Sequence, residues 1–203
     1  GDLYQLGQHR LLCGDSTAQS AVNVLMDGQK ADMVFTDPPY GVAVVKSGKV
    51  GADFGVAKKG QYKEVIGDET TETACKVIAL CEALEIEKQI FWGGNYYSNV
   101  LTPSSCWLIW DKRCESGIVN TFADAELAWT NLSGPTRVHH QLWNGMIRQG
   151  ESDKRVHPTQ KPVALAEWCF QQYTSNGETV LDLFGGSGST MIASEKLNRK
   201  CYM

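Results

Sequence analysis

Two short segments of this 203-residue chain contain residue types that can do chemistry. The first is Asp37-Pro38-Pro39-Tyr40, which directly follows the apolar run at 33–36. Ligands of open α/β sheets bind at the carboxyl ends of strands, and this segment is expected at such an end. The prolines lack N–H donors and fix the backbone, so their carbonyls remain as rigidly aimed acceptors. A carboxylate and a carbonyl can hold both hydrogens of an amino group, while the tyrosine ring stacks on a flat group. The alternative is a rigid turn with a surface tyrosine.

The second segment is a glycine-rich turn at 184–188, between a strand pattern that begins at Thr179 and a helix pattern that begins at Ser189. Glycine lets a ligand approach the backbone closely, and a helix N-terminus offers free N–H groups to an anion. A P-loop is disfavoured because no lysine follows the glycines. A dinucleotide turn is disfavoured because the third glycine is missing at the needed spacing. The turn therefore fits a carboxylate better than a pyrophosphate, and packing alone is the alternative.

Short apolar strands alternate with helix patterns along the chain, which predicts an α/β fold with a mostly parallel sheet. Strands are expected at 9–13, 33–36, 89–92, 107–110, 125–129, 138–143 and 179–183, with a last one from residue 200. Helices are expected at 18–27, 71–84, 163–173 and 189–197. Residues 41–67 and 144–160 have no clear periodicity. Irregular stretches of this length are usually functional or mobile.

Composition and charge narrow the class of protein. Hydrophobic residues make up 42% of the chain and charged residues 21%, which is typical of a globular protein. The seven cysteines are irregularly spaced without a Cys-x-x-Cys pair, so we expect reduced thiols and no metal site. No apolar run approaches the length that spans a bilayer. The net charge is −4, yet residues 41–63 hold five lysines and one acid. Residues 137–161 are also basic, so both segments are candidate contacts for an anionic partner.

Together the two segments resemble the motifs of one family, the DNA amino-methyltransferases that make N6-methyladenine or N4-methylcytosine. The motif order, with Asp-Pro-Pro-Tyr first and Phe-Gly-Gly-Ser-Gly last, resembles the β permutation group, in which the cofactor half of the sheet follows the catalytic half. Further landmarks along the whole chain are Cys13-Gly14-Asp15-Ser16, Phe91-Trp92-Gly93-Gly94-Asn95-Tyr96, Trp107-Leu108-Ile109-Trp110-Asp111-Lys112, Glu126-Leu127-Ala128-Trp129 and His157-Pro158-Thr159-Gln160-Lys161-Pro162.

The resemblance implies a Rossmann-like fold with an antiparallel hairpin, one domain over 1–203, and S-adenosyl-L-methionine as cofactor. It implies that Asp37 and the Pro38 carbonyl accept hydrogen bonds from the target amine and that Tyr40 stacks on a base flipped out of DNA. Asp37 would orient the amine rather than deprotonate it, because an aryl amine has no proton to lose before attack. The cofactor residues implied are Asp15, Asp37, Thr159, Lys161, Asp182, Phe184, Gly185, Gly186, Ser187 and Gly188. A helix N-cap is the alternative role for Asp15.

The first residue of the Asp-Pro-Pro-Tyr motif bears on the choice of target base. Because Asp37 at this position resembles the motif of the adenine-specific members, N6 of adenine in DNA is the expected target and N4 of cytosine is the alternative. More distant alternatives are amino-methylation of RNA or of a protein glutamine, and a non-catalytic module that binds DNA or cofactor. We expect the basic segments 41–67 and 131–160 to contact phosphates and give salt-sensitive binding with modest sequence preference. The candidate contacts are Lys46, Lys49, Lys58, Lys59, Arg137, Arg148 and Arg155.

The ends of the chain depart from the family. The chain begins at Gly1 rather than Met, and the methylases it resembles are phage-type or restriction–modification enzymes often fused behind a ParB-like domain. We therefore expect an upstream part, and a cytoplasmic, nucleoid-associated protein of a bacterium or phage. The last strand stops at Met203, before the acid that binds the cofactor ribose in the family. We expect a truncated C-terminal end with reduced cofactor affinity.

Overall fold

The computed structural model describes residues 1–41, 45–46, 49–50, 66–114, 123–143, 148–150, 157 and 160–203, with backbone alone at 45–46 and 49–50. The strands are β1 (Leu3–Leu6), β2 (His9–Leu12), β3 (Met33–Thr36), β4 (Val45–Lys46), β5 (Lys49–Val50), β6 (Lys88–Trp92), β7 (Trp107–Asp111), β8 (Ala125–Thr130), β9 (Arg137–His140), β10 (Thr179–Leu181) and β11 (Lys200–Tyr202). The helices are α1 (Gln19–Met26), α2 (Glu72–Ala83), α3 (Val163–Tyr173) and α4 (Ser189–Lys196), with short 3₁₀ turns η1 (Gly94–Tyr96) and η2 (Ser98–Val100).

Nine strands form one mixed sheet in the order β1-β2-β11-β10-β3-β6-β8-β7-β9, and β4 pairs with β5 separately. The central run from β2 to β6 is parallel throughout. Strand β8 runs antiparallel to both β6 and β7, while β7 and β9 are parallel. The predicted Rossmann-like α/β architecture with a mostly parallel sheet and an antiparallel hairpin is therefore confirmed.

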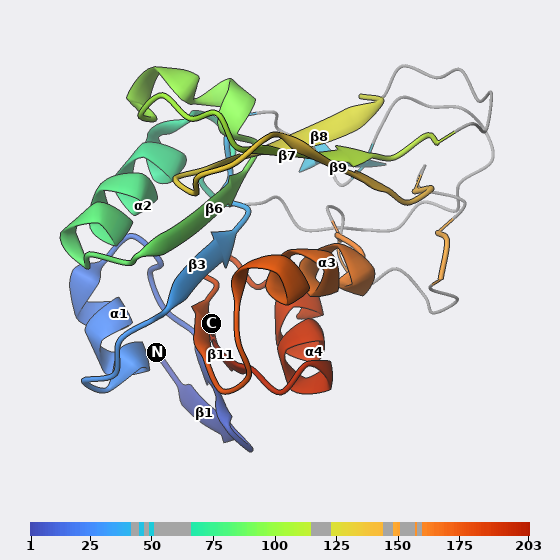
Figure 1. The fold of residues 1–203 in the computed structure, drawn as a ribbon. Coiled ribbons are helices and arrows are strands. Elements are labelled where there is room, and N and C mark those ends of the chain that lie inside the picture. Colours follow the sequence, from blue (N-terminus) through green and yellow to red (C-terminus); the bar gives the residue numbers. More distant parts are fainter. Residues whose placement is uncertain are drawn as a thin grey trace.

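Helices cover both faces of this sheet (Figure 1). On one face α1 and α2 pack Val22, Leu25 and Val77 into a core with the buried side chains of β3 and β6. On the other face α3 and α4 pack Leu165 and Ala193 into a second core. Because each sheet face is buried under helices, β3 carries four consecutive buried residues rather than an alternating pattern.

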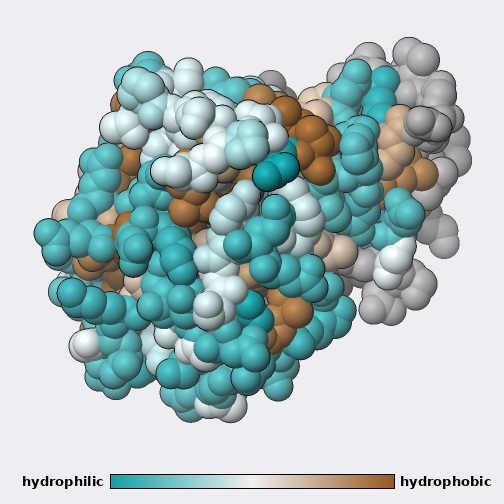
Figure 2. Space-filling model, in the orientation of Figure 1, coloured by the Kyte–Doolittle hydropathy of each residue, from teal (hydrophilic) through white to brown (hydrophobic). Residues whose placement is uncertain are grey.

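The surface over these helices is largely hydrophilic, with small scattered apolar patches (Figure 2). Within the described ranges, no helix combines the length and the apolar character needed to cross a membrane. The same part of the chain holds no group of three or more His, Cys, Asp or Glu side chains able to bind a metal ion.

Most predicted elements are found within one or two residues, but β1 and the β4–β5 pair were missed. The side chains of β1 are all exposed, so the strand has no buried face to give an alternating pattern. Its hairpin with β2 turns at Gly7, where φ is +61°. The expected strand at 138–143 is shorter and ends at His140.

Candidate active site

The two chemical segments meet because β3 and β10 are neighbouring parallel strands, so their carboxyl ends lie at the same edge of the sheet. Thr36, the last residue of β3, donates a hydrogen bond of 2.9 Å from its hydroxyl to Oδ1 of Asp182, just beyond β10. Asp182 Oδ1 also accepts the backbone N–H of Phe184 at 3.0 Å. Both Thr36 and Asp182 are buried. This pair of bonds ties the Asp-Pro-Pro-Tyr turn to the glycine turn.

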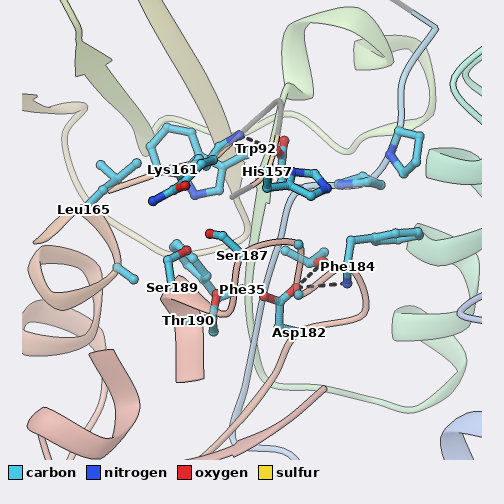
Figure 3. A pocket seen from close by; sticks show the side chains of 18 of the residues that line it. Phe35, Trp92, His157, Lys161, Leu165, Asp182, Phe184, Ser187, Ser189 and Thr190 are labelled. Carbon is cyan, nitrogen blue, oxygen red and sulfur yellow. Dashed lines mark hydrogen bonds and ion pairs between the residues drawn. The ribbon is translucent and has the colours of Figure 1, made fainter. Parts of the chain in front are cut away.

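A cavity of about 220 Å³ lies between the two turns. Its lining includes residues 37–40, Trp92 and Lys161, together with Asp182, Phe184 and the glycine turn. Figure 3 shows Lys161 and Trp92 on one side of this space and Asp182, Phe184 and Thr190 on the other. The first turn of α3 closes one end through Leu165 and Ala166.

Asp37 is held in an unusual environment within this cavity. Its Oδ2 accepts a hydrogen bond from the ammonium of Lys161. Its Oδ1 is buried and has no hydrogen-bond partner among the described residues. Burial raises the pKa of Asp37 above the usual carboxyl value, and the neighbouring ammonium of Lys161 opposes that rise. A buried carboxylate oxygen without a donor is costly, so the geometry calls for a donor from a ligand.

The ring of Tyr40 is packed against the turn after β6. It stacks on Tyr96 with ring centroids 4.6 Å apart and an interplanar angle of 11°. Gly93 has a φ of +77°, and a Cβ on it would lie 2.3 Å from Tyr40 Cε1, so only glycine permits this contact. Tyr97, whose hydroxyl donates to the Trp92 carbonyl, lies 6.3 Å from the Tyr40 ring. Burial raises the pKa of Tyr40, so the phenol stays neutral.

The glycine turn ends at the start of α4. Gly186 and Gly188 have φ values of +51° and +80°, and no side chain caps the helix at Gly188. A Cβ on Gly188 would meet none of the described residues within 4 Å, so there is open space beside the start of α4. Such a helix end attracts a carboxylate. A Cβ on Gly185 would instead collide with the Met203 sulfur at 2.5 Å.

Comparison with known proteins points to one family. The model of the DNA methylase family matches residues 126–203, which include Lys161 and the glycine turn. The type II methyltransferase M2.DpnII of Streptococcus pneumoniae is 22% identical over 207 residues, covering 86% of this chain and 77% of that protein. The resemblance to the DNA amino-methyltransferases is confirmed.

Solved methyltransferases share the fold. The complex of M1.HpyAVI with S-adenosylmethionine superposes with a TM-score of 0.53 at 19% identity, covering 94% of this chain and 90% of that one. The PvuII methyltransferase, which is specific for cytosine N4, superposes with a TM-score of 0.57 at 16% identity, covering 94% of this chain and 79% of that one. At these identities the comparison shows that the chain has the methyltransferase fold.

Most of the residues that the methyltransferase motifs predict line the cavity. Asp37, Pro38, Pro39 and Tyr40 do, as do Lys161, Asp182, Phe184, Gly185, Gly186 and Ser187. Gly188 is the residue that precedes α4. Thr159 lies outside the described residues.

Asp15 lies apart from the cavity lining and is exposed. Its Oδ1 accepts both the N–H and the hydroxyl of Thr17, and these bonds lower its pKa. Helix α1 is preceded by Ala18 without a side-chain cap, so the alternative role of Asp15 as helix cap is wrong. Ser16 donates its hydroxyl to the Leu183 carbonyl at 2.5 Å, which places this segment beside the carboxyl end of β10.

Two of the predicted DNA contacts can be placed. Arg137 is exposed on the edge strand β9. Arg148 is half-buried, with its guanidinium 5.7 Å from the centre of the Trp143 ring. The side chains of Lys46, Lys49, Lys58, Lys59 and Arg155 lie outside the described residues.

The sequence predicts no role for two residues that the structure brings to the site. Trp92 lines the cavity, and its Nε1 is buried without a partner in the described part of the chain. Glu126 accepts a hydrogen bond from Lys161 at 3.2 Å. Tyr96, for which the sequence leaves a place in the pocket and a helix cap as alternatives, stacks on Tyr40. All three stand in family landmarks, but nothing in their local pattern predicts which side chains meet across the sheet.

Proposed function

We propose that this chain transfers the methyl group of S-adenosylmethionine to the exocyclic N6 amine of adenine in DNA. The observation that carries the proposal is the buried Oδ1 of Asp37, which lacks a donor among the described residues and lies in a cavity walled by a glycine turn. An amino group entering this cavity supplies the missing hydrogen bond.

The roles of the residues follow from their atoms. Asp37 Oδ1 and the Pro38 carbonyl accept the two hydrogens of the amine, while Lys161 occupies the other carboxylate oxygen. The nitrogen lone pair is then aimed at the electrophile, and this alignment is the main catalytic contribution. After transfer the nitrogen carries an excess proton, which can pass to Asp37 Oδ1. Burial makes that carboxylate a better acceptor than a free one, because it raises the pKa of Asp37.

S-adenosylmethionine supplies an electrophilic methyl group on sulfur when bound. The chain offers its carboxylate the N-terminal N–H groups of α4, where Gly188 provides no side-chain cap. The absence of a side chain at Gly186 lets a ligand approach the backbone, and the Phe184 ring offers an apolar wall, while Gly185 leaves room for Met203. The donor set therefore fits the cofactor.

DNA supplies the second substrate in this proposal. A base flipped out of the duplex would enter between Tyr40 and the glycine turn. Arg137 and the other basic residues predicted above would hold the phosphates, so binding should weaken steeply with salt. An upstream ParB-like domain, the permuted motif order and the cellular location stay predictions.

Adenine is favoured over cytosine because the first motif residue is Asp37, as in the adenine-specific members that the sequence resembles. Cytosine remains the alternative because the chain shares its fold with the cytosine-N4-specific PvuII enzyme. The two targets present the same chemistry, a planar amine beside a ring nitrogen, so the cavity must discriminate by ring size.

The experiment is transfer of tritium from labelled cofactor to duplex DNA, RNA and protein, with Asp37→Ala as the inactive control. Label that appears on DNA with the wild type but not with Asp37→Ala supports the proposal. Label on RNA or protein would instead identify that polymer as the substrate. Two duplexes then separate the bases, one with hypoxanthine in place of adenine and one with uracil in place of cytosine. Loss of label with hypoxanthine alone supports adenine. Unchanged DNA binding without transfer in either protein would favour a non-catalytic binding module.

A further inference from the structure

Four charged side chains form an unbroken row that leads from the cavity into the β7–β8 hairpin. Lys112, which follows β7, donates to Glu126 Oε1 on β8 at 2.9 Å. The other oxygen of Glu126, Oε2, lies 3.2 Å from Lys161 Nζ, and Lys161 bonds Asp37. The charges alternate from one end of the row to the other, so each ammonium and each inner carboxylate faces an opposite charge.

This row is shielded from solvent to a degree that makes each member dependent on its neighbours. The side chains of Asp37, Lys161 and Glu126 are 21%, 12% and 25% exposed, and that of Lys112 is 16% exposed. Removing one partner from such a row leaves an uncompensated charge, which costs far more than an exposed pair. The ammonium of Lys161 therefore has a fixed place only while both of its carboxylates are present.

Neither Glu126 nor Lys112 is among the residues that line the cavity. Their effect passes through Lys161, which has three N–H donors and uses two of them on Asp37 and Glu126. A lysine side chain has four rotatable bonds, so a single carboxylate would leave its ammonium free to swing. With two carboxylates holding it, the ammonium stays on Oδ2 of Asp37 and leaves Oδ1 facing the cavity.

We propose that Glu126, itself fixed by Lys112, is a positioning residue that keeps the Lys161 ammonium on one oxygen of Asp37 and so presents the other oxygen to the target amine. This inference rests on the proposed function, since it assigns the orientation of Asp37 in that reaction. It gives a role to the two sequence landmarks at 107–112 and 126–129, which the proposed reaction leaves without one.

The electrostatics support the arrangement. Burial on its own would raise the pKa of Glu126, but the two ammonium groups outweigh it and lower that pKa to about 2, so Glu126 is ionised at neutral pH. Burial on its own would lower the pKa of Lys161, but its two carboxylate neighbours outweigh it and raise that pKa, so Lys161 stays protonated. Among the described residues, Asp182 and the phenols of Tyr40 and Tyr97 also interact electrostatically with Asp37, and Asp68 and His157 line the same cavity. Both phenols stay neutral because burial raises their pKa, and the ammonium of Lys161 is bonded directly to Asp37.

The first test measures methyl transfer by four variants. Glu126→Gln keeps the shape and the bond from Lys112 but removes the charge that holds Lys161. We expect kcat to fall about 10-fold, the effect of losing one charge-assisted hydrogen bond, with a smaller change in KM for the cofactor. The Lys161→Gln variant should have a still lower kcat. The Glu126→Gln/Lys161→Gln double variant should have the same kcat as Lys161→Gln, because the two residues act as one unit. The control is Glu178→Gln, which breaks a similarly exposed pair with Lys88 remote from the cavity.

The second test does not need activity. The midpoint of Asp37 titration is followed by the ¹³C shift of its carboxyl carbon. Lys161→Gln should raise the midpoint in the otherwise wild-type chain and raise it less in the Glu126→Gln background. Equal shifts in both backgrounds, or a kcat for Glu126→Gln equal to that of Glu178→Gln, would overturn the inference. If the wild type transfers no methyl group, the proposed function fails while the titration still decides whether Glu126 positions Lys161.

Discussion

Replacing Thr36 with valine tests how tightly the two chemical turns depend on each other. The substitution keeps the shape of the side chain and removes the 2.9 Å hydrogen bond from its hydroxyl to Asp182 Oδ1. Thr36 is 1% exposed and Asp182 is 3% exposed, so the bond is largely shielded from bulk solvent. A hydrogen bond to a charged group contributes about 1.5–3 kcal/mol to folding. For a chain of this length that loss lowers Tm by about 3–12 °C.

The loss of stability in the Thr36→Val variant should depend on pH in a defined direction. Burial raises the pKa of Asp182, and hydrogen bonds from Thr190, Phe184 and Thr36 oppose the rise. The Thr36 bond stabilises the carboxylate, so its loss raises that pKa further. The penalty should therefore be largest at high pH, where Asp182 is ionised, and should shrink as the pH falls and the carboxyl is protonated.

The assay is thermal unfolding of the wild type, Thr36→Val and Thr36→Ser across pH, together with cofactor binding by calorimetry. Serine retains the hydroxyl and should restore most of the stability. Cofactor affinity should fall in the valine variant, because Asp182 also holds the N–H of Phe184 at the start of the glycine turn. A valine variant with the wild-type Tm, or one whose penalty grows on acidification, would refute the reasoning.

Three further predictions concern the surroundings of the cavity. Gly93→Ala should lower kcat far more than Gly177→Ala, because both glycines have φ near +80° but only a Cβ at Gly93 would strike Tyr40; unfolding curves of the two variants check that the backbone strain is alike. Tyr96→Ala should raise KM for DNA about 2- to 12-fold by removing the stack on Tyr40, whereas Tyr96→Phe should not; equal KM values would show that the stack has no role. The stability of the wild type should fall as the pH drops from 4.5 to about 2, where Glu126 gains its proton, and Glu126→Gln should lack that component of the Tm profile.

The sequence predicted the order and bounds of the buried elements well because their signals are local. Strand β3 and helix α3 have the predicted bounds, since an unbroken apolar run and a proline just before the helix are visible without any partner. The exposed edge strand β1 gives no such signal, because its side chains are all exposed and pairing with β2 alone defines it.

The site residues that belong to a recognisable motif could be predicted from the sequence. The contacts that depend on how the strands pair in the sheet could not. The turns at 37–40 and 184–188 were found from their residue types. Asp37 and Lys161 are 124 residues apart, and only the packing of α3 against the sheet brings them together. Glu126 joins them because β8 runs antiparallel between β6 and β7, a pairing that no local pattern specifies. The stack of Tyr96 on Tyr40 likewise depends on the turn after β6.

The most direct test of the central claim is mass spectrometry of the nucleosides from duplex DNA incubated with the protein and S-adenosylmethionine. The account predicts N6-methyldeoxyadenosine from the wild type and none from Asp37→Ala. Detection of N4-methyldeoxycytidine instead would support methylation of an exocyclic amine and would identify cytosine as the target base. Unmodified nucleosides from a wild-type protein that binds both DNA and cofactor would contradict the claim that the open oxygen of Asp37 orients an amine for methylation.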